Sequence, residues 1–449
     1  MTSAAPQQGA PPDPDTILRS RGYLMILVFG AVVGLLAALV AYFFLKWVGD
    51  AQEYVFTTLP TDLGFDAAPT WWPIPILAIS GLVVGLTITY LPGTAGHEPA
   101  EGFKASGPVR PIDLPGIIIA SFVTLSLGVV LGPEAPLIAI GSGLGVLALH
   151  YLKRDAPAQA VMLIAGAGSF AAISTLLGSP LAGAFLLMEV AGVGAAMTGV
   201  VLVPGLLAAG IGALIFVGLD SLTGFGTFSL AVPDLPAFST PTGAEFLWAV
   251  GIGLAAAVVG TAIRRLALLA QPIVANRRIL MTPVAGVVVG VVAVAFVLGT
   301  DKGASDVLFS GQSALPSLID NAATWTVGAL VLLMLCKGVA YAASLSAFRG
   351  GPTFPGMFIG AAGGIALSHL PGLPLVAGAA MGIGAMTVVM LGLPLTSVLI
   401  TALFMQSDGV ALVPLVIVAV VVAYVASKRI TPEPVVTAAP SPDPTPLQG

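Results

Sequence analysis

Glu134 is the residue of this chain whose type and position point most directly to chemistry. It stands in the segment Leu131 to Pro136 (LGPEAP) and is the only charged residue between Asp113 and Lys153. A carboxylate within a membrane is costly to bury, and such residues usually face a cavity or a transport pathway. The neighbouring Gly and Pro residues break any continuous helix, and broken helices at membrane depth occur where the backbone is buried in protein or lines a wet space. The pattern therefore predicts a pore or transport pathway beside Glu134.

An alternative role for Glu134 is purely structural. A carboxylate in the first turn of a helix interacts favourably with the positive end of the helix dipole, so Glu134 could simply cap the helix that follows it. The sequence leaves both roles open, a pathway carboxylate and a local cap.

The pattern around Glu134 recurs in the second half of the chain. Gly132 to Pro136 (GPEAP) reappears 219 residues later as Gly351 to Pro355 (GPTFP), and Gly178 to Leu181 (GSPL) reappears 214 residues later as Gly392 to Leu395 (GLPL). Two matches in the same order at nearly the same offset indicate an internal duplication. Paired segments interrupted by Gly and Pro in two duplicated halves are a sequence sign of a transporter site between the repeats.

The composition predicts that these motifs lie in a membrane. The 449 residues are 57% hydrophobic and only 8% charged, with a mean hydropathy of +1.03, whereas soluble proteins have about 25% charged residues. Long apolar segments predict an all-α integral membrane protein. Several segments are shorter than the roughly 20 residues that a bilayer span needs, and the adjacent pair 159–177 and 180–193 predicts half-spanning helices that meet inside the protein.

Polarity and the repeat divide the chain into five predicted parts. Residues 1–20 and 431–449 are polar and proline-rich, which predicts disordered tails too small for a regulatory domain. Between them we expect a first membrane repeat at 21–218, a linker at 219–243 and a second membrane repeat at 244–430.

Basic residues flank the first helix, the last helix and the loop near 271–279. They are Arg19, Arg21, Arg264, Arg265, Arg277, Arg278, Lys428 and Arg429. By the positive-inside rule these places are cytoplasmic. We therefore expect a multi-pass protein of the cell membrane with both termini in the cytoplasm.

Four motifs, in their order along the chain, resemble the CLC family of chloride channels and chloride/proton antiporters. They are Gly93 to Gly102 (GTAGHEPAEG), Gly132 to Pro136 (GPEAP), Gly178 to Gly183 (GSPLAG) and Gly350 to Pro355 (GGPTFP). The resemblance extends over about residues 23–430. It implies an inverted repeat of two halves with many tilted and half-spanning helices, usually assembled as a homodimer with one anion pathway per subunit.

The residues themselves also fit an anion. Glycine-rich turns at 93–96, 132–136 and 350–355 precede apolar sequence, so we expect each to start a helix and all three to point backbone N–H groups at a shared site. Such a site holds an anion without a full positive charge that would trap it, and conduction requires binding that is favourable yet escapable.

The resemblance assigns roles to individual residues. In the CLC pattern the glutamate of the second motif occupies an anion position when ionised and moves or is protonated to let anions pass, and Glu134 matches this gating residue. The same pattern implies anion-binding residues on the three turns. These are Thr94, Ala95, Gly96, Gly132, Pro133, Ala135, Gly351, Thr353 and Phe354.

The chain departs from the family pattern at several of these positions. Ala95 replaces a serine, Pro133 replaces a basic residue, and Thr353 replaces a phenylalanine whose amide faces the anion. Pro352, just before it, has no N–H to offer. These changes could shift the preferred anion from chloride to fluoride, nitrate or another small anion.

Other charged residues bear on proton coupling and on access to the site. Val190 stands where CLC antiporters often carry a proton-relay glutamate, which favours a passive channel over an anion/proton antiporter. Glu189 is either a second pathway carboxylate or the buried partner of a basic residue. Arg349 is a possible pathway charge that would draw anions toward the pore mouth. Lys337 either supplies positive potential to a vestibule or snorkels or pairs with a carboxylate.

Other classes of function receive little support from the sequence. Scattered histidines lack metal-ligand spacing, and the chain contains no Walker-type phosphate loop. An intramembrane enzyme or a carrier of neutral solutes stays as the alternative from a different class. We expect a protein without enzymatic activity, cofactor or nucleic-acid partner, which contacts a small anion, membrane lipid and, in the antiporter alternative, protons.

Overall fold

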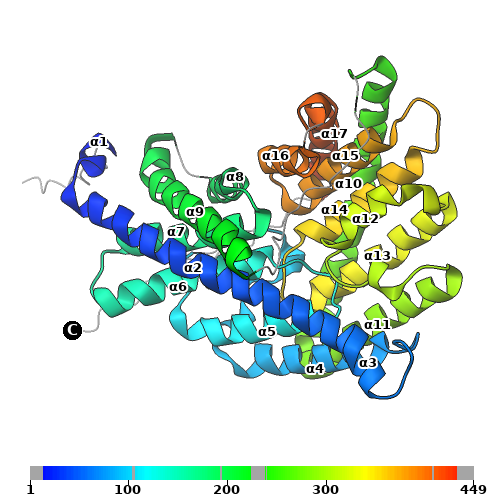
Figure 1. Cartoon of the computed structure of the whole chain (residues 1–449), viewed down its shortest axis with the longest axis horizontal. Coiled ribbons are helices and arrows are strands. Elements are labelled where there is room, and N and C mark those ends of the chain that lie inside the picture. Colours follow the sequence, from blue (N-terminus) through cyan, green and yellow to red (C-terminus); the bar gives the residue numbers. More distant parts are fainter. Residues whose placement is uncertain are drawn as a thin grey trace, which may run out of the picture.

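The computed structural model of the chain describes residues 14–103, 107–192, 195–223, 238, 240–406 and 409–431. Helices dominate these ranges, as the sequence predicts (Figure 1). The α-helices are α1 Pro14–Leu18, α2 Arg21–Glu53, α3 Leu59–Asp62, α4 Pro73–Tyr90, α5 Leu114–Ser126, α6 Glu134–Leu152, α7 Ala158–Leu177, α8 Pro180–Ala191, α9 Ala195–Thr223, α10 Gly243–Asn276, α11 Arg278–Gly299, α12 Ala314–Asp320, α13 Val327–Ala347, α14 Thr353–Leu367, α15 Leu375–Leu391, α16 Pro394–Phe404 and α17 Gly409–Ile430. Short 3-10 or π segments are η1 Tyr54–Thr58, η2 Pro92–Ala95, η3 Pro99–Glu101, η4 Pro111–Asp113, η5 Ala304–Asp306 and η6 Ala322–Thr324.

Many of these helices are long and apolar enough to cross a membrane. Within the described ranges 9 such spans occur, and α5, α8, α14, α15 and α16 are shorter apolar helices. The predicted short pair is present as α7 and α8, separated by Gly178 in the left-handed conformation (φ 61°). The chain is therefore an all-α protein with the composition and helix lengths of a multi-pass membrane protein.

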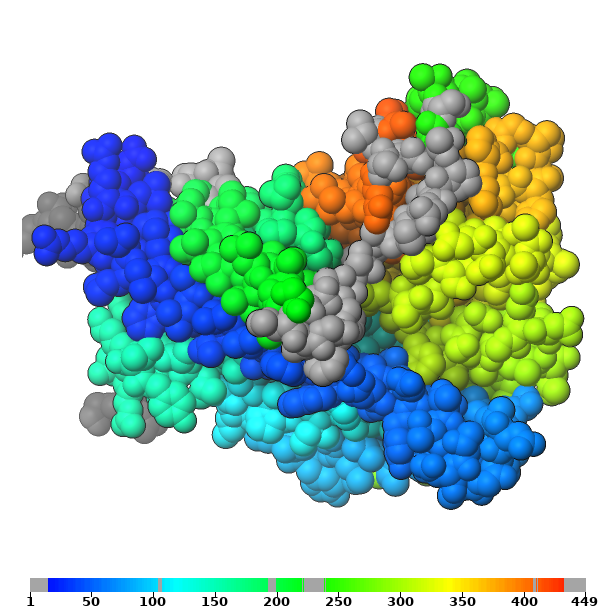
Figure 2. All heavy atoms as spheres, in the orientation of Figure 1, coloured from blue at the N-terminus to red at the C-terminus, as the bar shows by residue number. Residues whose placement is uncertain are grey.

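The helices of the first half lie together and those of the second half lie beside them. In Figure 1, α2 crosses the face of the blue-to-green helices, and the yellow-to-orange helices α12–α17 occupy the other side of the molecule. The space-filling view in Figure 2 shows the same two groups of colours in contact. Since helices of each group border the other, a site at their boundary receives residues from both halves.

Equivalent helices of the two halves pack through equivalent glycines. A Cβ atom on Gly141 of α6 would lie 2.3 Å from the carbonyl oxygen of Gly168 on α7, and one on Gly360 of α14 would lie 2.1 Å from that of Gly382 on α15. Both distances are shorter than any tolerable contact, so each helix pair approaches at backbone distance. Small residues permit this close packing in membrane helices.

The structure differs from the predicted division of the chain at two boundaries. The predicted tail 1–20 contains the helix α1, and Ser20 begins α2 by accepting a hydrogen bond from the Tyr23 N–H at 3.1 Å. Helix α9 continues to Thr223, past the expected start of the linker at 219. Most of the predicted linker, residues 1–13 and residues 432–449 lie outside the described residues.

Candidate anion site

The two copies of the glycine–proline motif lie against each other. The Gly132 N–H donates to the Gly351 carbonyl oxygen at 2.8 Å, and the Gly351 N–H donates to the Gly132 carbonyl oxygen at 2.6 Å. These two bonds form an isolated antiparallel bridge. Because each glycine closely precedes a helix, the bridge sets the N-terminus of α6 beside the N-terminus of α14.

Glu134 crosses this bridge and reaches the other helix. Its side chain is buried, with 1% of the residue exposed, and its Oε1 atom accepts a hydrogen bond from the Thr353 N–H at 2.5 Å. Its Oε2 atom has no hydrogen-bond partner within the described part of the chain. Thr353 is the residue that corresponds to Glu134 in the second copy of the motif, so the contact joins equivalent positions of the repeat.

The Glu134 carboxylate thus lies at the first turn of α14. Thr353 begins α14, where the N–H groups lack helical partners and the helix dipole is positive. Pro352 contributes no N–H, so the amide of Thr353 is the first donor available there. An anion in this place and the carboxylate of Glu134 would compete for the same donor.

One face of α13 supports both motifs. The Tyr341 hydroxyl donates to the Pro352 carbonyl oxygen at 2.5 Å, and the Ser344 Oγ atom accepts from the Val130 N–H at 3.1 Å. The sequence interpretation missed Tyr341 and Ser344. The sequence contains a pattern that points to them, because Lys337, Tyr341 and Ser344 have the i, i+4, i+7 spacing of one helix face within an otherwise apolar segment.

The first motif does not start a helix, and that prediction is wrong. Its turn has four consecutive positive φ angles, at Gly93 (76°), Thr94 (49°), Ala95 (57°) and Gly96 (92°). A helix needs negative φ, so the chain leaves this turn through irregular backbone and α5 begins only at Leu114.

Arg349 ties this turn to the fourth motif. Its guanidinium is buried, with 3% of the residue exposed, and donates to the Thr94 carbonyl oxygen at 3.2 Å, the Phe348 carbonyl oxygen at 3.3 Å and the Glu98 carboxylate at 3.1 Å. The charge is therefore paired. Arg349 therefore cross-links the first turn to the fourth motif, while its Glu98 partner is shared with Arg278. Its role as a pathway charge that draws anions stays a prediction.

Glu98 is shared between several donors and was not recognised as a site residue from the sequence. It also accepts from Arg278 at 2.5 Å and from the Gln271 side chain, both near the connection between α10 and α11. Burial would raise the pKa of the Glu98 carboxyl, but the hydrogen bonds from Arg278 and Gln271 and the charge of Arg349 outweigh burial and lower the pKa to about 2.

A cavity of about 710 Å³ brings the three predicted stretches together. Its wall includes residues of the first turn, the start of α6 and the segment before the fourth motif. These are Gly93, Ala95, Gly96, Ala135, Pro136, Arg349 and Gly350. The predicted gate Glu134 and the predicted anion-binding residues Thr94, Gly132, Pro133, Gly351, Thr353 and Phe354 are not among the lining residues. Val190 of α8 lies on the same wall, and the lining is largely apolar.

Glu189 has a different kind of partner from the one expected. Its carboxylate accepts from the Leu395 N–H at 3.0 Å and from the Thr396 N–H and hydroxyl, each at 2.7 Å. These groups form the first turn of α16. The alternative of a basic partner is therefore wrong, and Glu189 caps a helix of the opposite half.

No cluster of three or more His, Cys, Asp and Glu residues suitable for a metal occurs among the described residues. A buried carboxylate at a helix N-terminus, held at a backbone bridge between the two halves of the chain and next to a cavity lined mainly by the first half, defines a class of protein. That class is the membrane transporters with a discontinuous-helix ion site.

Comparison with known proteins identifies the family. A family model described as "Voltage gated chloride channel" matches residues 80–428. The chain therefore belongs to the voltage gated chloride channel family, the CLC family of ion channels and transporters, and it is not an enzyme.

Relatives and solved structures agree with this assignment. The chain is similar to proteins named "Putative ion-transport protein YfeO", at 28% identity over 365 residues (79% of this chain, 82% of the relative) in Escherichia coli strain SMS-3-5 and 29% over 362 residues (79% and 84%) in Salmonella newport strain SL254. Its fold is similar to that of a slow cyanobacterial Cl−/H+ antiporter, with a TM-score of 0.75 at 19% identity (91% of this chain, 95% of that chain). It is also similar to that of a CLC-type fluoride/proton antiporter, with a TM-score of 0.69 at 20% identity (91% and 97%).

Proposed function

We propose that this protein moves chloride or another small anion along a pathway that Glu134 gates, in exchange for protons. The observation that carries the proposal is the hydrogen bond from the Thr353 N–H to the buried Glu134 carboxylate. Proteins of the CLC family transport anions, and in this chain the carboxylate at the bridge between the two motifs occupies the donor that an anion would need.

Competition for one donor couples the anion to the proton. An ionised Glu134 is held by the helix N-terminus and excludes an anion from the Thr353 amide. A protonated Glu134 loses most of that attraction, because a neutral carboxyl interacts weakly with the helix dipole. An anion then takes the position, and the return of the carboxylate expels it. The solved Cl−/H+ and fluoride/proton antiporters of similar fold are consistent with this cycle.

A passive channel is the second candidate, and Val190 is the observation that favours it. Valine cannot carry a proton, and Val190 lies on the wall of the cavity where a relay carboxylate would be useful. In that case Glu134 opens the pathway without stoichiometric proton movement. An intramembrane enzyme or neutral-solute carrier has no comparable observation in its favour.

Proteoliposomes separate the two mechanisms. Vesicles loaded with 10-fold more chloride inside than outside, with the membrane potential clamped by valinomycin and potassium, are followed with an external pH electrode and a chloride electrode. The exchanger drives protons uphill as chloride leaves, whereas the channel releases chloride without uphill proton movement. Fluoride and nitrate in place of chloride rank the anions, and the absence of any anion-dependent flux would reject both mechanisms.

We also propose a location and an assembly. The Arg265 side chain of α10 donates to the Ile430 carbonyl oxygen at the end of α17, which supports a common face for the C-terminal end of α17 and the basic residues Arg264 and Arg265. With the positive-inside rule this face is cytoplasmic, in the cell membrane. Exposed Leu181 and Phe185 on α8 and Leu395 on α16 support a homodimer of the family type, which cysteine cross-linking at Phe185 in native membranes tests.

A further inference from the structure

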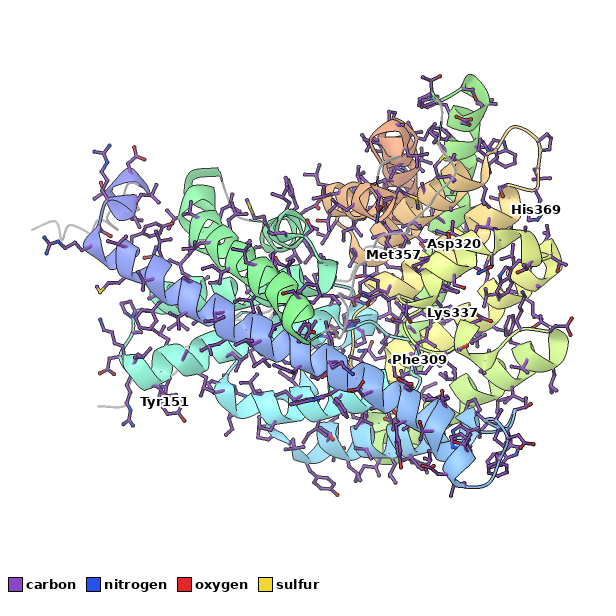
Figure 3. The ribbon with its side chains drawn as sticks, in the orientation of Figure 1. Tyr151, Phe309, Asp320, Lys337, Met357 and His369 are labelled. Atoms are coloured by element: carbon purple, nitrogen blue, oxygen red, sulfur yellow. The ribbon has the colours of Figure 1, made fainter. Side chains whose placement is uncertain are left out.

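Lys337 of α13 is completely buried, with 0% of the residue exposed, and its ammonium group faces a row of backbone carbonyl groups. The Nζ atom donates to the carbonyl oxygens of Asp306 (3.1 Å), Val307 (3.0 Å), Leu308 (3.1 Å) and Phe309 (3.3 Å). It also lies 4.5 Å from the centroid of the Phe358 ring. Figure 3 labels Lys337 and Phe309 next to each other in the second half of the molecule.

This arrangement is the coordination of a dehydrated monovalent cation. Four carbonyl oxygens from consecutive residues replace water around the charge, as they do for potassium in selectivity filters. The aromatic ring of Phe358 adds the favourable face of its quadrupole. An ammonium group has only three N–H bonds for four acceptors, so the site is defined by convergent oxygens and not by matched donor–acceptor pairs.

The segment that supplies the carbonyl groups does not adopt this conformation freely. Phe309 has a φ of +58°, which is uncommon for a bulky residue and persists only where the surroundings enforce it. Without a cation, four carbonyl dipoles would point at one another in apolar surroundings. Lys337 therefore holds the segment in a shape that the chain alone would not keep.

The same segment contacts the approach to Glu134. The Phe309 N–H donates to the Gly128 carbonyl oxygen at 3.2 Å, and the Phe309 ring packs against Phe56 with centroids 5.1 Å apart. Gly128 begins the short buried stretch that leads through Val130 to the bridge at Gly132. A displacement of Phe309 would thus be transmitted to this stretch through one backbone hydrogen bond.

We propose that the backbone of residues 306–309 is a monovalent-cation cage whose permanent occupant is the Lys337 ammonium group, and that the filled cage positions residues 128–132. Lys337 is a positioning residue in this proposal. An ammonium, methylammonium or potassium ion should replace the lysine head group when the side chain is shortened, because the oxygens and the ring remain in place.

The test uses the full-length purified protein and the variant Lys337→Ala. In buffers whose only cation is N-methylglucamine, which is too large for the cage, we expect its Tm to fall by at least about 5 °C, because four buried acceptors lose their partner. Addition of methylammonium or potassium chloride should restore most of the loss in this variant and leave the wild-type Tm unchanged. Hydrogen exchange of the peptide that covers residues 126–133 should accelerate in the variant and slow again with methylammonium.

Three further variants separate a carbonyl cage from a simple charge effect. Lys302→Ala removes a lysine that also lies over a ring, at 4.4 Å from Trp325, but near the surface, and should show no cation dependence. Asp306→Asn keeps the carbonyl group and removes a carboxylate that attracts the lysine charge, and its Tm should not respond to small cations because Lys337 still fills the cage. Lys337→Arg keeps the charge, but its planar fork cannot converge on four oxygens, so its Tm should fall.

Several results would overturn the cage. The proposal is wrong if the Tm of Lys337→Ala responds to small cations no more than the wild-type Tm does. It is also wrong if hydrogen exchange at residues 126–133 is unchanged in that variant. If Lys337→Ala does not fold in any buffer, the Tm of Lys337→Arg tests the proposal instead. A wild-type Tm in Lys337→Arg would mean that any buried positive charge suffices. These measurements report stability and hydrogen exchange and do not depend on anion flux. They can therefore fail or succeed independently of the test of Glu134 as the gate.

Discussion

Two carboxylates of the first half bind helix N-termini of the second half, and they do so differently. Glu134 is buried at the N-terminus of α14, with one oxygen bound to the Thr353 N–H and the other without a partner in the described chain. Glu189 is half-buried at the N-terminus of α16, and both of its oxygens accept hydrogen bonds. Both oxygens of Glu189 are thus hydrogen-bonded, whereas only one oxygen of Glu134 is.

The difference separates a movable carboxylate from a fixed cap. Removing Glu189 from α16 would break three hydrogen bonds, two of them to backbone amides that have no helical partner. Glu134 accepts a hydrogen bond from the Thr353 N–H on one oxygen, and its second, buried oxygen has no partner in the described residues, which is costly to maintain. A gating side chain must leave its site at a low cost in free energy, and Glu134 makes fewer hydrogen bonds at its helix N-terminus than Glu189 does.

The largest effect is expected from Glu134→Gln. A charge-assisted hydrogen bond is worth about 1.5–3 kcal/mol, which corresponds to roughly 10–150-fold in a rate or equilibrium. We expect proton-coupled transport to be lost and anion flux to become insensitive to pH, with the folded protein retained. Parallel chloride and proton measurements in proteoliposomes and size-exclusion profiles give the result.

Glu189→Gln is the matched control for this change. It removes the same charge from the equivalent contact at α16, and proton-coupled transport should persist. Wild-type flux and coupling in folded Glu134→Gln would remove Glu134 from the mechanism, and equal loss of coupling in both variants would abolish the distinction between gate and cap.

A smaller effect of the same kind is expected from alanine at the bridge. A Cβ atom on Gly351 would lie 2.1 Å from the Glu134 Cδ atom, and one on Gly132 would lie 2.0 Å from the Glu134 Oε2 atom. Either methyl group must displace the carboxylate from the Thr353 N–H. Gly351→Ala and Gly132→Ala should therefore both weaken proton coupling, by about tenfold or less because the carboxylate is still present.

Gly328→Ala on α13 is the control, since a Cβ atom there meets nothing within 4 Å. Opposite effects of the two bridge variants would contradict the view that both act by moving one carboxylate. Unchanged coupling in both would mean that the carboxylate does not rest at the bridge during transport.

The backbone features of the site could be predicted from the sequence, while its side-chain pairing could not. Gly132 and Gly351 match through spacing alone, and the structure joins them by two hydrogen bonds. Such a match is visible because glycine and proline act through the local chain. Glu134 is visible for a different reason, because a charge within an apolar segment is costly to bury and is usually kept for function.

The pairing of Arg349 with Glu98 illustrates the limit. The two residues are 251 positions apart, and no periodicity relates them, so the sequence alone does not reveal that Arg349 is paired with Glu98. The prediction for the first motif failed for a related reason, since the positive φ angles of Thr94 and Ala95 are unusual for these residues. That turn is held by the distant Arg349 side chain, which local sequence does not reveal.

A moderate effect on stability is expected from Glu189→Ala. Loss of a helix cap costs about 0.5–2 kcal/mol, which for a chain of this size corresponds to a Tm lower by roughly 1–2 °C. Chloride and proton movement should stay coupled at temperatures well below Tm. Thermal unfolding by intrinsic fluorescence, compared with Glu134→Ala, checks this, and loss of coupling in Glu189→Ala without a change in Tm would reverse the assignments of cap and gate.

The smallest effect concerns pH and the third carboxylate, Glu98, which is paired with arginines instead of amides. Its pKa in the folded protein is about 2, below the ordinary value of 4.5. A lowered pKa stabilises the fold above the ordinary value, and the contribution disappears as the pH falls from about 4.5 toward 2. The Tm difference between the wild type and Glu98→Gln should therefore be constant from pH 7 to 5 and shrink between pH 4.5 and 3. Because Glu98 is partly exposed and shared among several donors, the difference should be small, and a difference that grows on acidification would mean that the carboxylate is not held by Arg349 and Arg278.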